Sequence, residues 1–511
     1  MRKTLTYRNS RLDSVCKIGR TLYRLPPSTA SPPTSASSCP PCPPSTATFA
    51  PSTSRFASCM EQRQAMIQGA SIGPKLLRIR SVRKSSKNLV FLEVDHIVPP
   101  QPGSAAPLVL PQVLCSVSAM ADTSPLDEEE TRAVLAGLRR YDVVLLDAVE
   151  GTNAKGQRVW RARSVDLVSP CLAALQPARD AKAHEVDSVT LRHRTWLLRP
   201  AAVALQRARS SGVTAWRRLL TDLSFAELAT PILWPSVSGA AASPFATTPT
   251  RGSHHELFLR IAPELFLKRA LAGGLASRVF EIGPSFRDEG ADATHAPEFH
   301  TLEAYAMLAT ASDMQALTED LCASFVGAAL PCLRDLPIDE ATATALQQPF
   351  ASVRYVDSLR DALRRRVPEC LPPADKDDLS WLSDVAVLRS LATQARLPEV
   401  LEGEPRDAGT IVDRLFGALV EPSLVAPTFV THQPLFMSPL AAACPHDDRL
   451  ADRFELFVRG REIANGYTEL VDPVEQERRF AGQSTAPAAA EVDERVEPVE
   501  AAFLDALDVG L

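Results

Sequence analysis

The chain of 511 residues is long enough for two or three domains with at least one large hydrophobic core. With 45% hydrophobic and 23% charged residues, its composition is ordinary for a soluble globular protein. The net charge of −6 excludes a chain-wide basic field for nucleic acid, so any such contact requires a local basic patch. Ten cysteines are too few for a disulfide scaffold of this length and indicate a reducing compartment. No apolar run of 18 residues is evident, so we expect no membrane span.

Residues 1–60 differ from the rest of the chain. They are rich in serine and threonine and carry one acid, Asp13, against a set of basic residues: Arg2, Lys3, Arg8, Arg11, Lys17, Arg20, Arg24 and Arg55. This composition is typical of a mitochondrial transit peptide. The low-complexity tract at 26–51 lacks the apolar residues that a core requires. We therefore expect import into the mitochondrial matrix; a tail without a targeting role, in a cytoplasmic protein, is the alternative.

Residues 61–178 read as a small β-rich domain. Five runs have the β-branched and apolar composition of strands: 76–82, 88–94, 112–119, 142–149 and 155–168. One predicted helix, at 127–141, interrupts them. Five short strands with one helix fit an OB-fold β-barrel, a frequent reader of single-stranded nucleic acid. Basic residues cluster locally, as a nucleic-acid surface or a solvated charged face would require: Lys75, Arg78, Arg80, Arg83, Lys84 and Lys87.

Residues 179–511 read as a second, larger domain, which makes the chain α+β. Strand-like runs are separated by helical segments, and the paired runs favour antiparallel hairpins. We predict a mainly antiparallel sheet flanked by helices. Residues 367–408, with a helical stretch between Pro- and acid-rich connectors, are expected to form a surface insertion.

The stretch FRDEGADATHAPEFH, residues 286–300, is dense in charge yet lies between two strand-like runs. If residues 278–286 and 299–308 pair as antiparallel strands, alternation places Thr301, Glu303 and Tyr305 on one face. Arg287 follows the first strand, where its fork of donors can bind a carboxylate or phosphate. His295 in the loop can reach a polyanion on the sheet. This pattern predicts a nucleotide site that works by positioning and charge rather than through a covalent nucleophile.

A second candidate site lies in RFELFVRGREIANGYTEL, residues 453–470. A hairpin turn at residues 459–460 makes Glu455 and Glu462 diagonal neighbours on one face. Two such carboxylates repel each other unless a cation lies between them, and Mg²⁺ bound to phosphate oxygens fits that role. An exposed acidic strand face is the alternative. Three further polar residues share the face only if a bulge lies near residues 463–465: Asn465, Tyr467 and Glu469.

Several segments of the chain resemble class II lysyl-tRNA synthetases. They are RIAPELFLKR (260–269), FRDEGADATHAPEFHTLEAY (286–305) and FELFVRGREIANGYTELVDPVEQERRF (454–480). Upstream, LSFAELATPIL (223–233) resembles the first class II motif. IRSVRKSSKNLVFLEV (79–94) resembles the anticodon-binding OB domain of the family. The resemblance covers about residues 70–511.

The resemblance implies a role for each matching residue. Arg287 corresponds to the arginine that bridges the α-phosphate of ATP and the carboxylate of the amino acid, and is the expected catalytic residue. Further ATP contacts are implied for Glu289, His295 and Phe299, with the Phe299 ring stacked on adenine. Glu455 and Glu462 correspond to the Mg²⁺ ligands, and Phe91 to a ring that stacks on an anticodon base. The implied lysine-binding residues are Gly239, Glu264, Glu303, Tyr305, Asn465, Tyr467 and Glu469.

The implied function is lysine–tRNA ligase: lysine reacts with ATP to form lysyl-adenylate, and the lysyl group is transferred to the 3′ end of tRNA(Lys). The ε-ammonium of lysine is strongly hydrated, and the carboxylates of Glu264, Glu303 and Glu469 can replace that hydration. We expect Glu303 or Glu469 to meet the ε-ammonium and Glu264 the α-amino group. The resemblance also implies a homodimer. With the composition of residues 1–60 and the lack of a long apolar run, we expect a role in mitochondrial translation and no membrane partner.

One motif of the family is missing from this sequence. The third class II motif has the form G-x-G-x-x-R, and no such pattern occurs up to Leu511. We therefore expect the 511 residues to be a C-terminally incomplete version of the catalytic domain. A catalytically inactive truncated paralogue that binds tRNA or protein partners is the alternative. A ligase acting on a translation factor is disfavoured, because such enzymes lack the OB domain.

Overall fold

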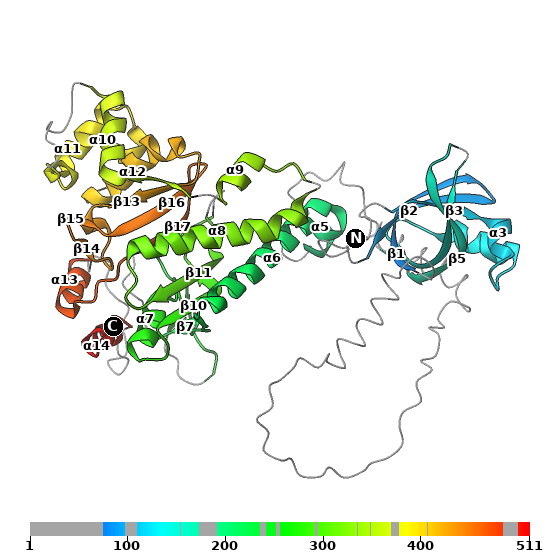
Figure 1. Cartoon of the computed structure of the whole chain (residues 1–511), viewed down its shortest axis with the longest axis horizontal. Helices are drawn as coiled ribbons and strands as arrows, with labels where there is room; N and C mark the ends of the chain where they lie inside the picture. Colours follow the sequence, from blue (N-terminus) through cyan, green and yellow to red (C-terminus); the bar gives the residue numbers. More distant parts are fainter. Residues whose placement is uncertain are drawn as a thin grey trace, which may run out of the picture. The chain divides into compact units, whose positions relative to one another are not determined.

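The computed structural model describes residues 75–97, 110–153, 155–172, 192–235, 242–251, 256–291, 295–334, 336–347, 349–368, 378–405, 407–483 and 499–510. The chain divides into two compact units, Met1–Arg199 and Pro200–Leu511 (Figure 1). The predicted transit peptide at 1–60 and the predicted domain boundary at 178–179 lie outside the described residues.

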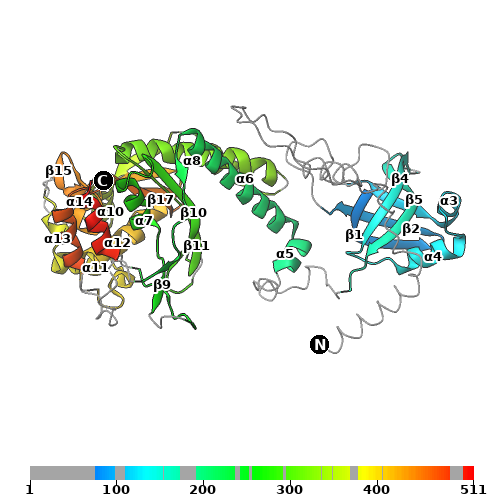
Figure 2. The same ribbon diagram turned by 90° about the horizontal axis from the view of Figure 1, so that it is seen from below.

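The first unit contains a closed barrel with the strand order β1-β2-β3-β5-β4 (Figure 2). Strands β3 and β5 pair in parallel, and the other neighbouring strands pair antiparallel. Alternate residues such as Leu77, Ile79 and Leu92 point into the barrel and are fully buried. The elements of this unit are β1 (Lys75–Ser86), β2 (Leu89–His96), β3 (Gln112–Ser116), α3 (Val117–Ala121), α4 (Glu128–Gly137), β4 (Val143–Thr152), β5 (Arg158–Ser169) and α5 (Arg192–Leu198).

The five predicted strands of the barrel are confirmed, and one helix was missed. The run 112–119 was predicted to be strand throughout, but its end forms α3, where Val117 and Met120 are buried in the barrel core. The predicted helix is α4. It begins at a capping box in which Asp127 accepts a hydrogen bond from the backbone of Glu130 while Glu130 accepts one from the backbone of Asp127.

In the second unit, β10 lies at the centre of a three-stranded sheet, β11-β10-β6. Its Phe280 packs with Leu220 of α6 and Leu317 of α8, so these two long helices cover one face of the sheet (Figure 2). A second, small sheet with the strand order β7-β9-β8 is formed by segments that lie between β6 and β10 in the sequence. The elements are α6 (Pro200–Asp222), β6 (Ala226–Glu227), β7 (Leu233–Trp234), β8 (Ala246–Thr247), β9 (Leu257–Leu259), α7 (Glu264–Ala272), β10 (Arg278–Phe286), β11 (Glu298–Ala306) and α8 (Ala311–Leu333).

A four-stranded sheet, β12-β13-β16-β17, completes the second unit. Alternation along its central strands buries both faces: Val430 and Phe457 pack against α10–α12, whereas Phe429 and Leu456 pack against α8. The elements are α9 (Glu340–Ala345), β12 (Ala351–Arg354), α10 (Tyr355–Arg366), α11 (Val385–Gln394), α12 (Ala408–Leu419), β13 (Thr428–Thr431), β14 (Ala443–Cys444), β15 (Asp447–Ala451), β16 (Arg453–Val458), β17 (Arg461–Tyr467), α13 (Pro473–Gln483) and α14 (Val499–Asp508), with short 3-10 helices at Ser380–Leu382, Pro398–Leu401, Glu421–Ser423 and Leu435–Met437.

Two predictions about this unit are wrong. Its sheets are mixed rather than mainly antiparallel, because β6 pairs with β10 and β12 with β13 in parallel. Each parallel pair is joined by a long crossover, which local hairpin signals do not reveal. The described part of 367–408 is also not a surface insertion, since Trp381 and Leu388 are buried in the core beside α12.

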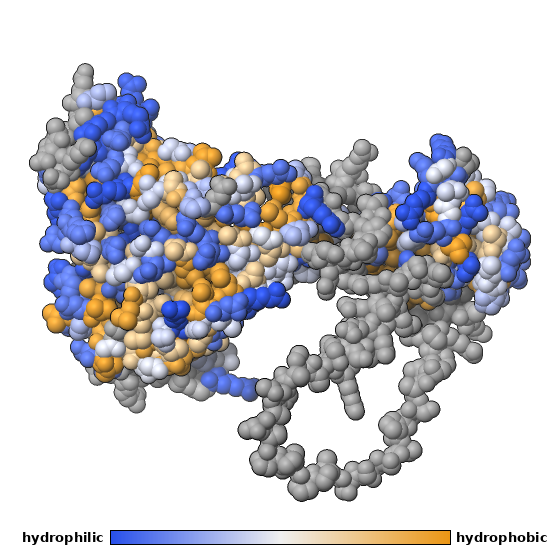
Figure 3. Space-filling model, viewed as in Figure 1, coloured by the Kyte–Doolittle hydropathy of each residue, from blue (hydrophilic) through white to orange (hydrophobic). Residues whose placement is uncertain are grey.

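One described helix, α8, is long and apolar enough by length and composition to cross a membrane. The sequence prediction found no such stretch because Asp313, Glu319 and Asp320 interrupt it. In this fold α8 packs along α6, where the Trp216 and Phe325 rings lie 4.6 Å apart between centroids. Figure 3 shows apolar surface interspersed with polar surface over the region of these helices.

Candidate active site

The predicted pairing around the charged loop is confirmed. Strands β10 and β11 are antiparallel, with Phe286 opposite Glu298 and Glu281 opposite Glu303. The loop between them is closed by a hydrogen bond from the Arg287 amide to the Pro297 carbonyl. The Arg287 guanidinium lies 5.3 Å from the centre of the Phe299 ring. Its Nε is buried and makes no hydrogen bond with the described part of the chain, which leaves that donor for a ligand.

The other two predicted residues of this loop lie at the surface. Glu289 and His295 are exposed, and Gly290 adopts a φ of 86°, which turns the chain sharply after Glu289. Phe299 is half-buried at the start of β11. The structure therefore places a cation, a ring and two exposed polar side chains at the open end of β10 and β11.

An acidic cluster forms where α7, β11 and the end of β17 meet. Glu264, the first residue of α7, accepts a hydrogen bond from the Tyr467 hydroxyl. The Tyr305 hydroxyl donates to Glu303 over 2.8 Å. The third acid, Glu469, follows β17. Burial, and then the charge of Glu264, raise the pKa of Glu303 to about 7. Burial also raises the pKa of Glu469 to about 7.

Lys268, which the sequence analysis did not single out, lies within this cluster. Its Nζ is 2.6 Å from Glu264 and 2.5 Å from Glu469, and the side chain is 1% exposed. Burial disfavours the ammonium, but attraction to the two carboxylates outweighs it and raises the Lys268 pKa above its usual value. For Glu264, attraction to Lys268 outweighs burial in the same way and lowers the pKa. The spacing of Glu264 and Lys268, four residues apart on a helix, was the available sequence signal.

The hairpin β16–β17 carries the other predicted carboxylates. Its turn is at Arg459 and Gly460, which both have positive φ. Phe457 lies opposite Glu462 and Leu456 opposite Ala464, so Ile463 is the extra residue of a bulge at the predicted place. The bulge puts Glu462 on the same face as four residues that alternate along the hairpin: Arg453, Glu455, Asn465 and Tyr467.

Glu455 forms an ion pair with Arg453. Arg453 Nη2 lies 2.6 Å from Glu455 Oε1. Burial, and repulsion from Glu462, raise the pKa of Glu455 to about 7 although Arg453 opposes this. Glu462 is exposed and accepts a hydrogen bond of 3.2 Å from Asn465 Nδ2. Asn465 therefore lies beside the carboxylate pair, while Tyr467 belongs to the acidic cluster.

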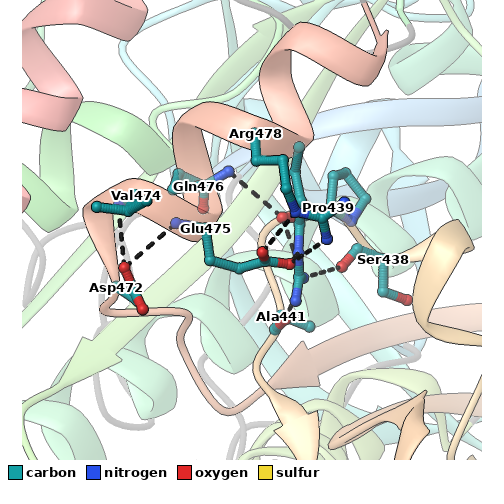
Figure 4. Close-up of polar contacts among 9 residues, drawn as sticks. Ser438, Pro439, Ala441, Asp472, Val474, Glu475, Gln476 and Arg478 are labelled. Carbon is teal, nitrogen blue, oxygen red and sulfur yellow. Dashed lines mark hydrogen bonds and ion pairs between the residues drawn. The ribbon is translucent and has the colours of Figure 1, made fainter.

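A loop anchored by α13 positions Glu469. Ala441 forms a β-bridge with Glu469, and the amide of Leu470 donates to the carbonyl of Leu440. Figure 4 shows how α13 holds this loop: Gln476 donates to the Pro439 carbonyl. Within α13 itself, Glu475 pairs with Arg478. Arg479 donates to the carbonyl of Ala441 over 2.7 Å.

A buried ion pair behind the cluster also escaped the sequence analysis. Arg260 Nη2 lies 2.7 Å from Glu281 Oε1, with 1% and 7% of the side chains exposed. The Thr230 hydroxyl donates to Glu281. A side chain on Gly283 would collide with Arg260 Nη2 at 2.5 Å, so glycine is required there. This network supports β10, the strand that pairs with β11 and places Glu281 opposite Glu303.

Two predicted residues are not part of this site as described. Gly239 lies outside the described residues, so its role stays a prediction. Phe91 is on β2 of the barrel, half-buried, with the Arg83 guanidinium 4.5 Å from the centre of its ring.

Comparison with known proteins places the second unit in a family. The family of class II tRNA synthetases (D, K and N) matches residues 187–511. A lysine–tRNA ligase of Cladosporium cladosporioides is 33% identical over 447 residues, covering 85% of this chain and 69% of that protein. A lysine–tRNA ligase of Mycobacterium bovis (strain BCG / Pasteur 1173P2) is 35% identical, covering 72% and 70%. One of Streptococcus pyogenes serotype M5 (strain Manfredo) is 37% identical, covering 59% and 57%.

The matched region thus covers between 57% and 70% of the length of each of these relatives. The fold and the comparisons define a class II synthetase domain of the aspartate, lysine and asparagine group. Within that group, the chain belongs to the class II lysyl-tRNA synthetases, a family of ligases that form aminoacyl-tRNA.

Proposed function

We propose that the chain is a lysine–tRNA ligase that activates lysine with ATP and transfers it to the 3′ end of tRNA(Lys). The observation that carries this proposal is the acidic cluster of Glu264, Glu303 and Glu469, half-buried beside two tyrosines. Three carboxylates suit the two ammonium groups of lysine and would repel the side chain of aspartate. Aspartate-specific relatives would need a cationic pocket at this place.

The residues of β10 and β11 supply the ATP end of the proposed site. The lysine carboxylate attacks the α-phosphorus of ATP and pyrophosphate leaves; a ribose hydroxyl of the tRNA then attacks the adenylate. Arg287, with its unpaired Nε, neutralises charge between the two reactants. The Phe299 ring stacks on adenine, and Glu289 and His295 contact its edge and the terminal phosphate. The chain's own groups bind and orient, and no protein nucleophile is required.

Glu455 and Glu462 would hold Mg²⁺ on the phosphates. The residues fit a cation: they share one face, and burial, with repulsion from Glu462, raises the pKa of Glu455, so a divalent ion can replace the proton. When bound, the ion neutralises phosphate charge.

We further propose that the barrel is an OB-fold that binds the anticodon of the tRNA. Its closed five-stranded topology and the outward placement of Phe91 beside Arg83 support this reading. A base stacked on the Phe91 ring would also lie over a cation.

We propose a homodimer in the mitochondrial matrix. The resemblance of residues 223–233 to the first class II motif, through which the family dimerises, supports the homodimer. The basic, hydroxylated composition of residues 1–60 supports import. Cytoplasmic retention of the full chain fused to a fluorescent protein would refute the matrix location.

Lysine-dependent exchange of labelled pyrophosphate into ATP tests the central proposal. The full chain with Mg²⁺ is expected to exchange with lysine and not with aspartate or asparagine. Exchange with aspartate, or none with a folded protein that binds ATP, would refute it. Aminoacylation of tRNA(Lys) transcripts then tests the second step.

A further inference from the structure

Lys268 is a fully buried ammonium that the chemistry proposed above does not use. It contacts Glu264 at 2.6 Å and Glu469 at 2.5 Å. Three rings surround it, with centroids 5.1 Å away for Tyr467, 5.7 Å for Phe503 and 5.8 Å for Tyr305. Burying a charge costs several kcal/mol, on the order of the gain from pairing it, so the residue contributes little stability compared with an apolar side chain. A role in organising the two carboxylates accounts for the cost.

The two carboxylates have an inner and an outer side. Lys268 is 1% exposed, whereas Glu264 is 21% and Glu469 is 26% exposed. Lys268 binds Oε1 of Glu264 and Oε2 of Glu469 from the buried side. Among the described residues, the second oxygen of each carboxylate makes no hydrogen bond. These oxygens remain for a cation that enters from the open side.

The charges of the cluster are unbalanced. Three carboxylates, Glu264, Glu303 and Glu469, share one ammonium, that of Lys268. Arg453 and Arg260 contribute from neighbouring elements, and the two tyrosines are neutral hydrogen-bond donors. With its carboxylates ionised the cluster therefore has a net negative charge, which favours binding of a ligand that carries ammonium groups.

We propose that Lys268 is a positioning residue for lysine recognition: it holds Glu264 and Glu469 together from behind, so that their outer oxygens converge on the ammonium groups of the substrate. This inference rests on the proposed lysine–tRNA ligase function. Without the Lys268 ammonium, the two buried carboxylates repel each other, separate and take up protons. The same oxygens then no longer receive the substrate.

Lys268→Met keeps an unbranched side chain, one atom shorter than that of lysine, and removes its charge. We expect it to raise the KM for lysine in pyrophosphate exchange at least about 30-fold at pH 7, with the KM for ATP within about threefold of the wild type. The acidic limb of the pH profile of kcat/KM for lysine should move to higher pH, because carboxylates without a counter-ion ionise later. Arg269→Met, which removes the adjacent cation on α7, is the matched control and should change neither parameter.

Lys268→Ala allows chemical rescue. Propylammonium supplies the three carbons and the ammonium that this substitution removes, and should restore exchange; 1-propanol should not. Thermal unfolding verifies the fold of each variant. Equal rises in the KM for lysine and ATP, or rescue by 1-propanol as well, would assign Lys268 to packing alone and overturn the inference. So would loss of the fold in both Lys268 variants while Arg269→Met folds.

Failure of the proposed function has a different signature. A wild-type protein without exchange refutes the ligase proposal but leaves lysine binding to be measured by calorimetry. A wild-type protein that exchanges, with Lys268 variants that keep the wild-type KM for lysine, refutes only the role of Lys268.

Discussion

Glu303 is the residue at which burial and function oppose each other most directly. Its pKa is raised to about 7 by burial and by the charge of Glu264, yet it must be ionised to receive an ammonium. The Tyr305 hydroxyl, 2.8 Å away, holds the carboxylate in one orientation. Ionisation of Glu303 and binding of lysine are therefore coupled: each favours the other.

Glu303→Gln keeps the size of the side chain and removes its charge. We expect the KM for lysine to rise about 30-fold or more, since removing one partner of a buried ion pair costs roughly 2–5 kcal/mol. In the wild type, kcat/KM for lysine should rise between pH 6 and pH 8 as Glu303 ionises; in the variant this rise should shrink. Glu298→Gln, an exposed acid on the same strand, is the control. A wild-type KM for lysine in Glu303→Gln would exclude Glu303 from recognition.

At the scale of elements, the bulge in β17 decides which side chains reach the site. Deleting Ile463 removes the extra residue but keeps Asn465 opposite Glu455, because Glu462 and Asn465 are then two residues apart and regular alternation places them on one face. We expect the deletion variant to retain lysine-dependent exchange, because Asn465 and Tyr467 keep their facing. Ile463→Ala should change kcat/KM less than about twofold, because this side chain is half exposed. Loss of exchange in a folded deletion variant would show that the bulge itself, and not only the facing of these residues, is required.

The pair α6–α8 offers a second test at this scale. A Cβ on Gly212 would lie 2.3 Å from the Phe325 ring, whereas nothing lies within 4 Å of one on Gly327. Gly212→Ala should therefore lower the free energy of unfolding by about 1–3 kcal/mol through overpacking. Gly327→Ala on α8 should raise it by about 0.5–1 kcal/mol. Denaturant unfolding measures both, and adding Phe325→Leu to Gly212→Ala should recover most of the loss.

The same elements show how far sequence reasoning reaches. Strands β10 and β11, the turn at Arg459–Gly460 and the bulge follow from alternation and turn chemistry, which act over a few residues. The parallel partners of β10 and β12 do not, because each pair is joined through a long crossover. Lys268 was missed for a related reason: its helical spacing from Glu264 is visible in the sequence, but its contact with Glu469 depends on the whole fold.

At the scale of the molecule, the site makes the protein's stability depend on pH. Burial raises the pKa of three carboxyls, Glu303, Glu455 and Glu469, to about 7 in the folded chain. Between about pH 4.5 and pH 7 the unfolded chain has released these protons while the folded chain retains them. Folding therefore takes up protons in this window, and the free energy of unfolding falls as the pH rises. The loss is on the order of 3 kcal/mol per group at most.

The melting temperature of the full chain should accordingly fall from pH 5.5 to pH 8. The double variant Glu303→Gln/Glu469→Gln should show a shallower fall, because two of the three titrating groups are gone. Lysine with ATP and Mg²⁺ should raise the melting temperature more at pH 8 than at pH 5.5, since Mg²⁺ and the ammonium groups of lysine bind the ionised carboxylates. A melting temperature that rises with pH across this window, or an unchanged slope in the double variant, would mean that the carboxyls are ionised in the folded protein without a ligand. In that case the acidic cluster would be preformed for lysine, and recognition would need no proton release.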